Sequence, residues 1–174
     1  MVRCTFSPPW AWRPAVGARL ARTLGSTTNL SLLHMPKITF TSYDGASYQF
    51  LPKGGFSTQD CCGYDNGKHV CTFETMSLSS NKLHVEHFAV SKPMIGKGYG
   101  ESCLRHFAAL VKVQMPYVCE ITFDLGRSLT GSDISRLAQA RKVLFENVGA
   151  VDICIRQCNT SSKVVGAAWK QQAW

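Results

Sequence analysis

The chain has 174 residues, of which 45% are hydrophobic and 17% are charged, and such values are typical of a globular protein. The length favours one domain, and no segment approaches the roughly 20 apolar residues that a membrane-spanning helix needs. The net charge of +8 is uneven, because residues 1–34 contain four arginines and no acid. The remainder is mildly basic, which allows a nucleic-acid partner but does not indicate one.

Residues 1–34 are rich in Arg, Ser and Thr and are interrupted by prolines. This composition is that of an organellar transit peptide, whereas a secretory signal needs a longer continuous apolar core. The favoured alternative is a poorly ordered extension, or a true translation start at Met35. We therefore expect a basic extension over 1–34 and a domain over 35–174. The expected location is cytoplasmic, or mitochondrial if the extension is a transit peptide.

Alternating and apolar runs predict the strands, and helical spacing predicts two helices. The predicted strands are 37–43, 47–51, 70–78, 83–91, 117–125, 150–157 and 164–171. The first two form a hairpin around "DGA", and the glycines and polar residues of 52–69 predict a loop. The order is four strands, a helix, a strand, a helix and two strands. It predicts an α/β (α+β) fold with a mixed, mostly antiparallel sheet and flanking helices.

The predicted helices span 99–114 and 134–147, with Ser132 or Asp133 as the cap of the second. The apolar face of the first helix is expected to contain Leu104, Phe107, Ala108, Leu110 and Val111. The apolar face of the second is expected to contain Leu137, Ala140, Leu144 and Phe145. Arg141 and Lys142 are expected on its solvated side.

The eight cysteines indicate a reducing compartment more than a metal site. Cys103, Cys119 and Cys154 lie in apolar runs and are expected to be buried as small hydrophobic residues. The remaining cysteines lack the paired C-x-x-C spacing of a structural zinc site, so no metal is predicted.

The segment "MIGKGYG" (94–100) places three glycines between a predicted strand and a predicted helix. Glycine lets backbone N–H groups approach an anion closely, and a helix N-terminus adds positive potential. The loop does not fit the P-loop pattern, because Ser91 takes the place of the first glycine. It does not fit the dinucleotide fingerprint either, because Glu101 takes the place of the last glycine.

The strand ending in Val90, the loop "IGKGYG" and the following helix resemble the GNAT superfamily of acetyl-CoA-dependent N-acetyltransferases. The "KGYG" run is similar to that of histone-type members, and "CEITFDL", "ISRLAQARKVLF" and "ENVGAV" resemble later family segments. The resemblance covers roughly residues 37–174. It implies a GNAT-like acyl-CoA N-acyltransferase fold, in which strands 83–91 and 117–125 splay apart to hold the coenzyme arm.

The resemblance implies direct transfer of an acetyl group from acetyl-CoA, without a metal, to an amine. The acceptor classes are a protein lysine or N-terminus, a small amine, or an aminoacyl group. By resemblance, the Phe88 amide holds the thioester carbonyl and Val90 pairs with the pantetheine arm. The pyrophosphate site comprises the loop residues Ile95, Gly96, Lys97, Gly98, Tyr99 and Gly100.

The expected base that takes the proton of the amine is Glu86, with His84 as an alternate or relay. Both share the strand parity of Val90, and a base is needed because only a neutral amine attacks. An equally weighted alternative is that both are ordinary polar residues of a half-exposed strand.

Two departures from the family pattern concern Ile95, where Gln or Arg is usual, and Phe145, where the family often has a tyrosine acid. They suggest an alternative, a non-catalytic acyl-CoA-binding or protein-interaction module on the same fold. A third and weaker alternative is a nucleic-acid-binding protein whose glycine loop binds phosphate. The expected assembly is a monomer or homodimer, and no membrane association is expected.

Overall fold

The computed structural model describes residues 36–50, 59–128 and 134–174. These residues belong to one compact unit, His34–Trp174. The expectations for residues 1–34 and for a cap at Ser132 or Asp133 lie outside the described residues.

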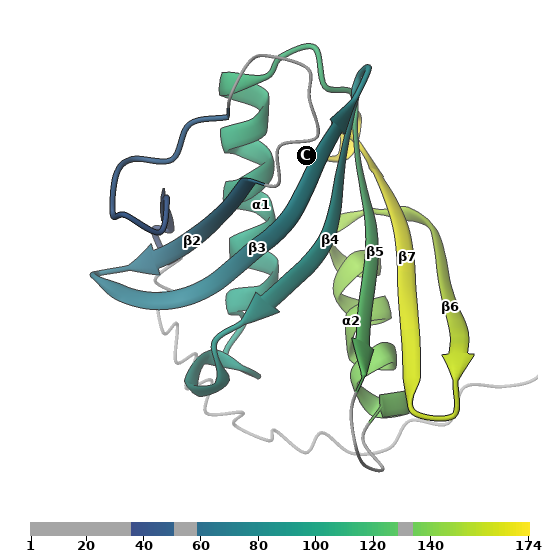
Figure 1. Ribbon diagram of the computed structural model, residues 1–174. Coiled ribbons are helices and arrows are strands. Elements are labelled where there is room, and N and C mark those ends of the chain that lie inside the picture. Colours follow the sequence, from purple (N-terminus) through teal and green to yellow (C-terminus); the bar gives the residue numbers. More distant parts are fainter. Residues whose placement is uncertain (1–35, 51–58, 129–133) are drawn as a thin grey trace, which may run out of the picture. The chain divides into compact units, whose positions relative to one another are not determined.

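The described strands form one seven-stranded sheet in the order β1-β2-β3-β4-β5-β7-β6 (Figure 1). Their bounds are Thr39–Thr41 (β1), Gln59–Asp65 (β2), Lys68–Ser79 (β3), Lys82–Val90 (β4), Glu120–Ser128 (β5), Val151–Asn159 (β6) and Ser162–Lys170 (β7). Every neighbouring pair is antiparallel except β4 and β5. The predicted mixed, mostly antiparallel sheet is therefore confirmed.

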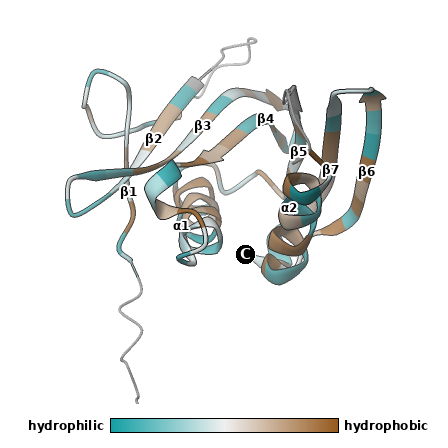
Figure 2. Ribbon diagram, turned by 90° about the horizontal axis from the view of Figure 1, so that it is seen from below, coloured by the Kyte–Doolittle hydropathy of each residue, from teal (hydrophilic) through white to brown (hydrophobic). Residues whose placement is uncertain are grey.

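The two helices, α1 (Tyr99–Gln114) and α2 (Ile134–Val148), lie against the same face of the sheet (Figure 2). Short 3-10 helices follow β4 and β7, at Lys92–Met94 and Gln171–Ala173. From α1, the Phe107 ring stacks on Phe73 of β3 with centroids 4.0 Å apart. Each such buried ring contributes about 1.5–3 kcal/mol through removal of apolar area from water. In the described residues no helix covers the other face, which we call the open face.

The second strand differs from the sequence prediction. Segment 47–50 is not a regular strand: it forms an isolated antiparallel bridge between Thr41 and Ser47, and the Tyr48 N–H donates to the Phe40 carbonyl at 3.1 Å. Strand β2 lies within the predicted loop 52–69 instead. The glycine of β2 serves close packing and not a turn, because a Cβ on Gly63 would lie 2.5 Å from Cys71 Sγ. Cys61 and Cys62 are both buried, so β2 lacks the alternation by which strands are recognised.

Strand β4 changes its alternation near its middle. Leu83 and Val85 are buried against the helices, and the next buried side chain is Phe88. Across the ladder, Thr75 of β3 has a φ of +54°, which breaks the regular pleat at the level of Glu86. The predicted alternation along this strand is therefore wrong, because Val85 and Phe88, which were expected on opposite faces, are both buried.

The face that α2 buries is also shifted from the predicted one. It buries Ala138, Arg141, Phe145 and Val148. Ala140 is exposed and Arg141 is buried, so both expectations were wrong. The buried positions still follow the helical period. Because one of them is an arginine, the pattern of apolar residues did not reveal which face of the helix is buried.

Burial of the cysteines follows the sheet more than their local sequence. Cys103 is buried on α1 as predicted, whereas Cys119 and Cys154 are exposed. Cys154 lies on β6, an edge strand with most residues exposed, and Cys119 precedes β5. An apolar run on an edge strand does not ensure burial, because one side of the strand has no neighbour.

Candidate active site

The central feature of the sheet is a split between its two parallel strands. β4 pairs with β5 only where Lys82–Val85 faces Glu120–Phe123. Beyond this ladder β4 continues to Val90, while β5 continues to Ser128 paired with β7 alone. Figure 1 shows the two strands diverging toward the glycine loop. The splay implied by the sequence resemblance is therefore present.

One buried carboxylate joins three strands at the closed end of the split. Glu120 of β5 is 4% exposed and forms ion pairs with Lys82 of β4, at 3.3 Å, and with Lys170 of β7. Hydrogen bonds from Lys170 and then Lys82 lower the pKa of Glu120, against the opposing effect of burial. The closed end is thus held by charge as well as by the ladder.

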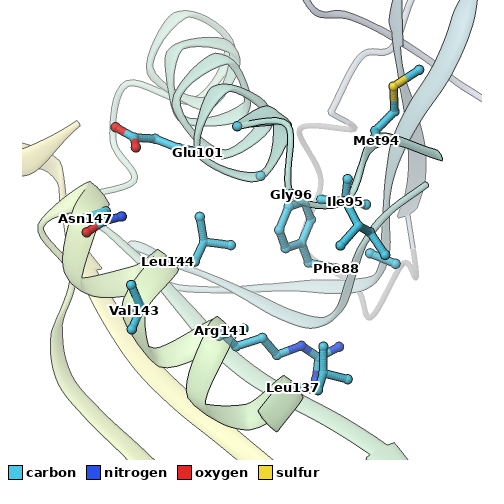
Figure 3. Close-up of a pocket in the computed structure, with 15 residues that line it drawn as sticks. Phe88, Met94, Ile95, Gly96, Glu101, Leu137, Arg141, Val143, Leu144 and Asn147 are labelled. Atoms are coloured by element: carbon cyan, nitrogen blue, oxygen red, sulfur yellow. The ribbon is translucent and has the colours of Figure 1, made fainter. Parts of the chain in front are cut away.

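The open end of the split borders a cavity of about 330 Å³ (Figure 3). Its walls are residues 88–90 of β4, residues 94–96, 98 and 100 of the loop, Glu101 of α1, and the side of α2 that carries Leu137, Arg141 and Leu144. Figure 3 shows the α2 side chains projecting from one wall, with Phe88 and Ile95 on another. The cavity therefore joins the glycine loop to the split.

The glycines of the loop have different structural roles. Gly96 and Gly98 both have φ of +79°, a left-handed conformation that favours glycine, and a Cβ on either would meet open space. Gly98 is the N-cap of α1, whose first N–H groups have no carbonyl of a preceding turn to bind. Gly100 instead allows close packing, because its Cβ would lie 3.3 Å from both Leu144 methyl groups.

The structure divides the residues predicted to bind the coenzyme. Those that line the cavity are Val90, Ile95, Gly96, Gly98 and Gly100. The side chain of Lys97 is exposed, and its N–H donates to the Met94 carbonyl at 3.2 Å.

Tyr99 is turned toward β2, where its hydroxyl donates to Asp65 Oδ2 at 2.8 Å, a hydrogen bond that raises the pKa of Tyr99. Neither Lys97 nor Tyr99 therefore directs its side chain to the cavity wall.

The three residues predicted for catalysis lie along β4 at successive levels of the split. His84 lies within the closed ladder, with Nδ1 2.9 Å from Thr122 Oγ1 of β5. Glu86 is exposed just beyond the ladder, and Phe88 lines the cavity. His84 is thus on the open face and Phe88 is on the helix side, while Glu86 is exposed where the ladder ends.

A second cluster on the open face was missed by the sequence analysis. His87 Nε2 lies 3.6 Å from Glu74 Oε2 on the paired residue of β3. The hydroxyl of Tyr43 donates to Glu74 Oε1 at 2.7 Å, which raises the pKa of Tyr43. Strict alternation predicts that His87 and His84 lie on opposite faces, and no pattern in the sequence predicts that His87 and Tyr43 contact the same glutamate. A carboxylate that holds an imidazole in this way suits proton transfer.

Arg141 is the other residue that the sequence analysis missed. It is 8% exposed, lines the cavity and donates from one terminal nitrogen to the Leu125 carbonyl of β5 at 3.2 Å. Glu101, on the α1 wall, is paired with Arg105 at 2.9 Å. The cavity therefore has an arginine on its α2 side, and on its α1 side a carboxylate whose charge is paired with Arg105 of the same helix.

Phe145 lies away from the cavity wall. Its side chain is fully buried and packs against Phe123 of β5, with ring centroids 4.7 Å apart. The position that the resemblance relates to a tyrosine acid is thus part of the core.

In the described part of the chain, no three His, Cys, Asp or Glu side chains gather closely enough to hold a metal ion. Among the described helices, none has the length and apolar character needed to cross a membrane.

Comparison with solved structures retrieves N-acetyltransferases. One is a ribosomal-protein-alanine N-acetyltransferase from Escherichia coli, 13% identical, with a TM-score of 0.49 over 77% of this chain and 94% of that one. Another is an acetyltransferase of the GNAT family from Streptococcus pneumoniae, 12% identical, with a TM-score of 0.47 over 67% and 68%. A third is the aminoglycoside acetyltransferase AAC(6')-Ib in complex with coenzyme A, 17% identical, with a TM-score of 0.48 over 68% and 69%.

No family model matches the sequence, and no curated protein matches it. The identities of these structures to the chain are low, and their TM-scores lie below 0.5.

Proposed function

We propose that this protein is an acetyl-CoA-dependent N-acetyltransferase of the GNAT type. The observation that carries the proposal is the split between β4 and β5, which opens onto a cavity beside a glycine loop and a helix N-terminus. A phosphate group suits the loop, because backbone N–H groups and the helix dipole favour an anion there. A strand-like arm suits the unpaired edge of β4 beyond Val85.

The residues fit acetyl-CoA at both ends of the cavity. The pyrophosphate site comprises the backbone of Gly96 and Gly98 and the first N–H groups of α1, with the Lys97 side chain as a nearby cation. The pantetheine arm lies beside Val90, and the N–H of Phe88 holds the thioester carbonyl. Bound acetyl-CoA supplies the acetyl group; the protein positions it in the split.

The open face supplies the acceptor side of the proposed reaction. Glu86 is the proposed base, with His84 as the alternate, because Glu86 is exposed just beyond the end of the ladder and His84 is on the open face within its last pairs. The His87–Glu74 pair adds a third group on the same face. The acceptor is an amine, either on a protein or on a small molecule. Its attack requires one of these groups to take its proton.

Two further proposals concern the whole chain. Residues 35–174 form the acetyltransferase domain, supported by the compact unit His34–Trp174. Urea unfolding of the chain with and without residues 1–34 tests this boundary, and a lowered midpoint in the shorter chain would contradict it.

We also propose that the protein is a cytoplasmic monomer or homodimer. Cell fractionation tests the location, and light scattering tests the assembly.

Binding of acetyl-CoA is the first test of the function. We expect isothermal calorimetry to detect micromolar binding to the full chain. We also expect Gly98→Leu to weaken it at least tenfold, because a side chain at a positive φ distorts the loop and fills the phosphate position. Ser161→Ala, in the exposed turn between β6 and β7, is the matched control. No binding at millimolar acetyl-CoA would reject the proposal.

Release of CoA thiol in the presence of a panel of amines is the second test. We expect turnover in the wild type and a loss of at least tenfold in kcat for Glu86→Gln, with unchanged affinity for acetyl-CoA. His84→Gln and His87→Gln identify the base if Glu86→Gln retains full activity. Binding without turnover on any amine would favour the alternative, a non-catalytic acyl-CoA-binding module on this fold.

A further inference from the structure

The parallel ladder sets the register of β4 and β5 where the split begins. The last pair is Val85 with Phe123, so Leu125, two residues further along β5, lies at the level of His87, next to Phe88. The Leu125 carbonyl is the group to which Arg141 donates, at 3.2 Å. The guanidinium of Arg141 therefore lies on the β5 side of the split, and it lines the same cavity as Phe88.

Burial makes this charge effective within the cavity. Arg141 is 8% exposed and lies among apolar residues of α2, including Leu137 and Leu144. A guanidinium stays protonated at all working pH values, and its field is screened less in such surroundings than in water. Helix α2 thus places a charged residue on its cavity-facing side, next to the split.

We propose that Arg141 stabilises the negative charge that develops on the coenzyme A sulfur during acetyl transfer. This inference rests on the proposed function and on the placement of the thioester beside Phe88. The acceptor nitrogen bonds to the acetyl carbon, the carbon–sulfur bond breaks, and its electron pair stays on sulfur. The base on the open face takes the proton of the amine, and solvent protonates the sulfur after transfer.

With Arg141 in this role, position 145 needs no hydroxyl. A thiolate that is held by a guanidinium can leave without being protonated at once, because charge stabilisation replaces proton donation. Arg141 cannot act as an acid itself, since its pKa lies far above neutrality. Its contact with the substrate is therefore electrostatic and hydrogen-bonding only.

The ionisation of bound coenzyme A tests the inference without any acceptor amine. We expect the pKa of the bound thiol, followed by ultraviolet absorbance of the thiolate, to lie about one unit below that of the free thiol. That shift is a tenfold larger thiolate fraction at a fixed pH below both values. Arg141→Gln should return it to the free value, whereas Arg141→Lys should keep part of the shift. Lys142→Gln, the neighbouring residue on the same helix, should leave the shift unchanged.

A second measurement needs only the wild type, in case the Arg141 variants fail to fold. Its affinity for coenzyme A, relative to S-methyl coenzyme A, should rise about tenfold as pH rises from neutrality past the free thiol pKa. A flat ratio, or an equal bound-thiol pKa in wild type and Arg141→Gln, would overturn the role of Arg141 alone. A wild type that binds neither ligand would overturn the proposed function and this inference with it.

Discussion

At the scale of single residues, identity alone is a poor guide to role in this protein. Phe145 aligns with a catalytic position by resemblance, yet it packs in the core, while Arg141, expected in solvent, lines the cavity. The two residues are one helical turn apart on α2. Chemistry at this site therefore depends on which side of the turn faces the split.

Phe145→Tyr separates the two views of that position. We expect the added hydroxyl to lower the free energy of unfolding by about 1–3 kcal/mol, because it enters a fully buried contact with Phe123 and no partner is provided. We expect no gain in turnover, because the ring does not line the cavity. Urea unfolding and thiol release measure the two effects. Undiminished stability together with faster turnover would show that the ring reaches the split.

At the scale of elements, the connection from β4 to α1 gives its glycines unlike tasks. Gly98 ends the loop in a left-handed conformation, whereas Gly100 lies within the first turn of α1 against Leu144. One is a conformational requirement and the other is a packing requirement. The spacing in the sequence does not distinguish them.

Alanine at the two positions should therefore have different effects on stability. We expect Gly98→Ala to lower the free energy of unfolding by about 1 kcal/mol, because alanine is strained at a φ of +79°. Gly100→Ala should change it by less than about 0.5 kcal/mol, since better helix propensity offsets the 3.3 Å contact with Leu144. Thermal unfolding of both variants measures the difference. Equal destabilisation would contradict this division of roles.

Elements with strong local patterns were predictable, and those shaped by distant contacts were not. Helix α1 has the predicted bounds, since its apolar spacing and Pro116 define it locally. Strand β2 was missed because close packing against Cys71 on the neighbouring strand, and not an alternating pattern, determines its glycine and adjacent cysteines. The cavity-lining loop residues followed from the motif. The placement of Arg141 was not predictable because the buried stripe of α2 is shifted, and that of His87 was not predictable because β3 is kinked at Thr75.

At the scale of the whole described unit, the sheet consists of two halves joined by one short ladder. The pairs from Lys82 to Val85 and the buried Glu120 hold the halves together on the closed side. The Glu120 contacts reach β4, β5 and β7 at once. This carboxylate therefore ties the two halves together beside the ladder.

Glu120→Gln should lower the free energy of unfolding by about 2 kcal/mol at pH 7, because charge-assisted hydrogen bonds to two lysines are lost. The pKa of Glu120 is lowered in the folded protein, so its stabilisation is present above the unfolded value of about 4.3. It is lost as pH falls through the folded value. The difference from wild type should therefore shrink in urea unfolding at pH 3.

Glu146→Gln is the control for that comparison, since the pair of Glu146 with Lys142 is exposed and should contribute less than about 0.5 kcal/mol at either pH. A deficit of Glu120→Gln that stays the same at pH 3 would contradict the linkage.

The split also couples ligand binding to the free energy of unfolding. A ligand between β4 and β5 would stand in for the ladder that ends at Val85, so it should bind the folded chain and not the unfolded one. At a hundred times its Kd, such a ligand adds about 2.7 kcal/mol to the free energy of unfolding. The unfolding temperature therefore becomes an assay that needs no turnover. Acyl groups and amines can be ranked by the thermal shift that each produces before any acceptor is identified.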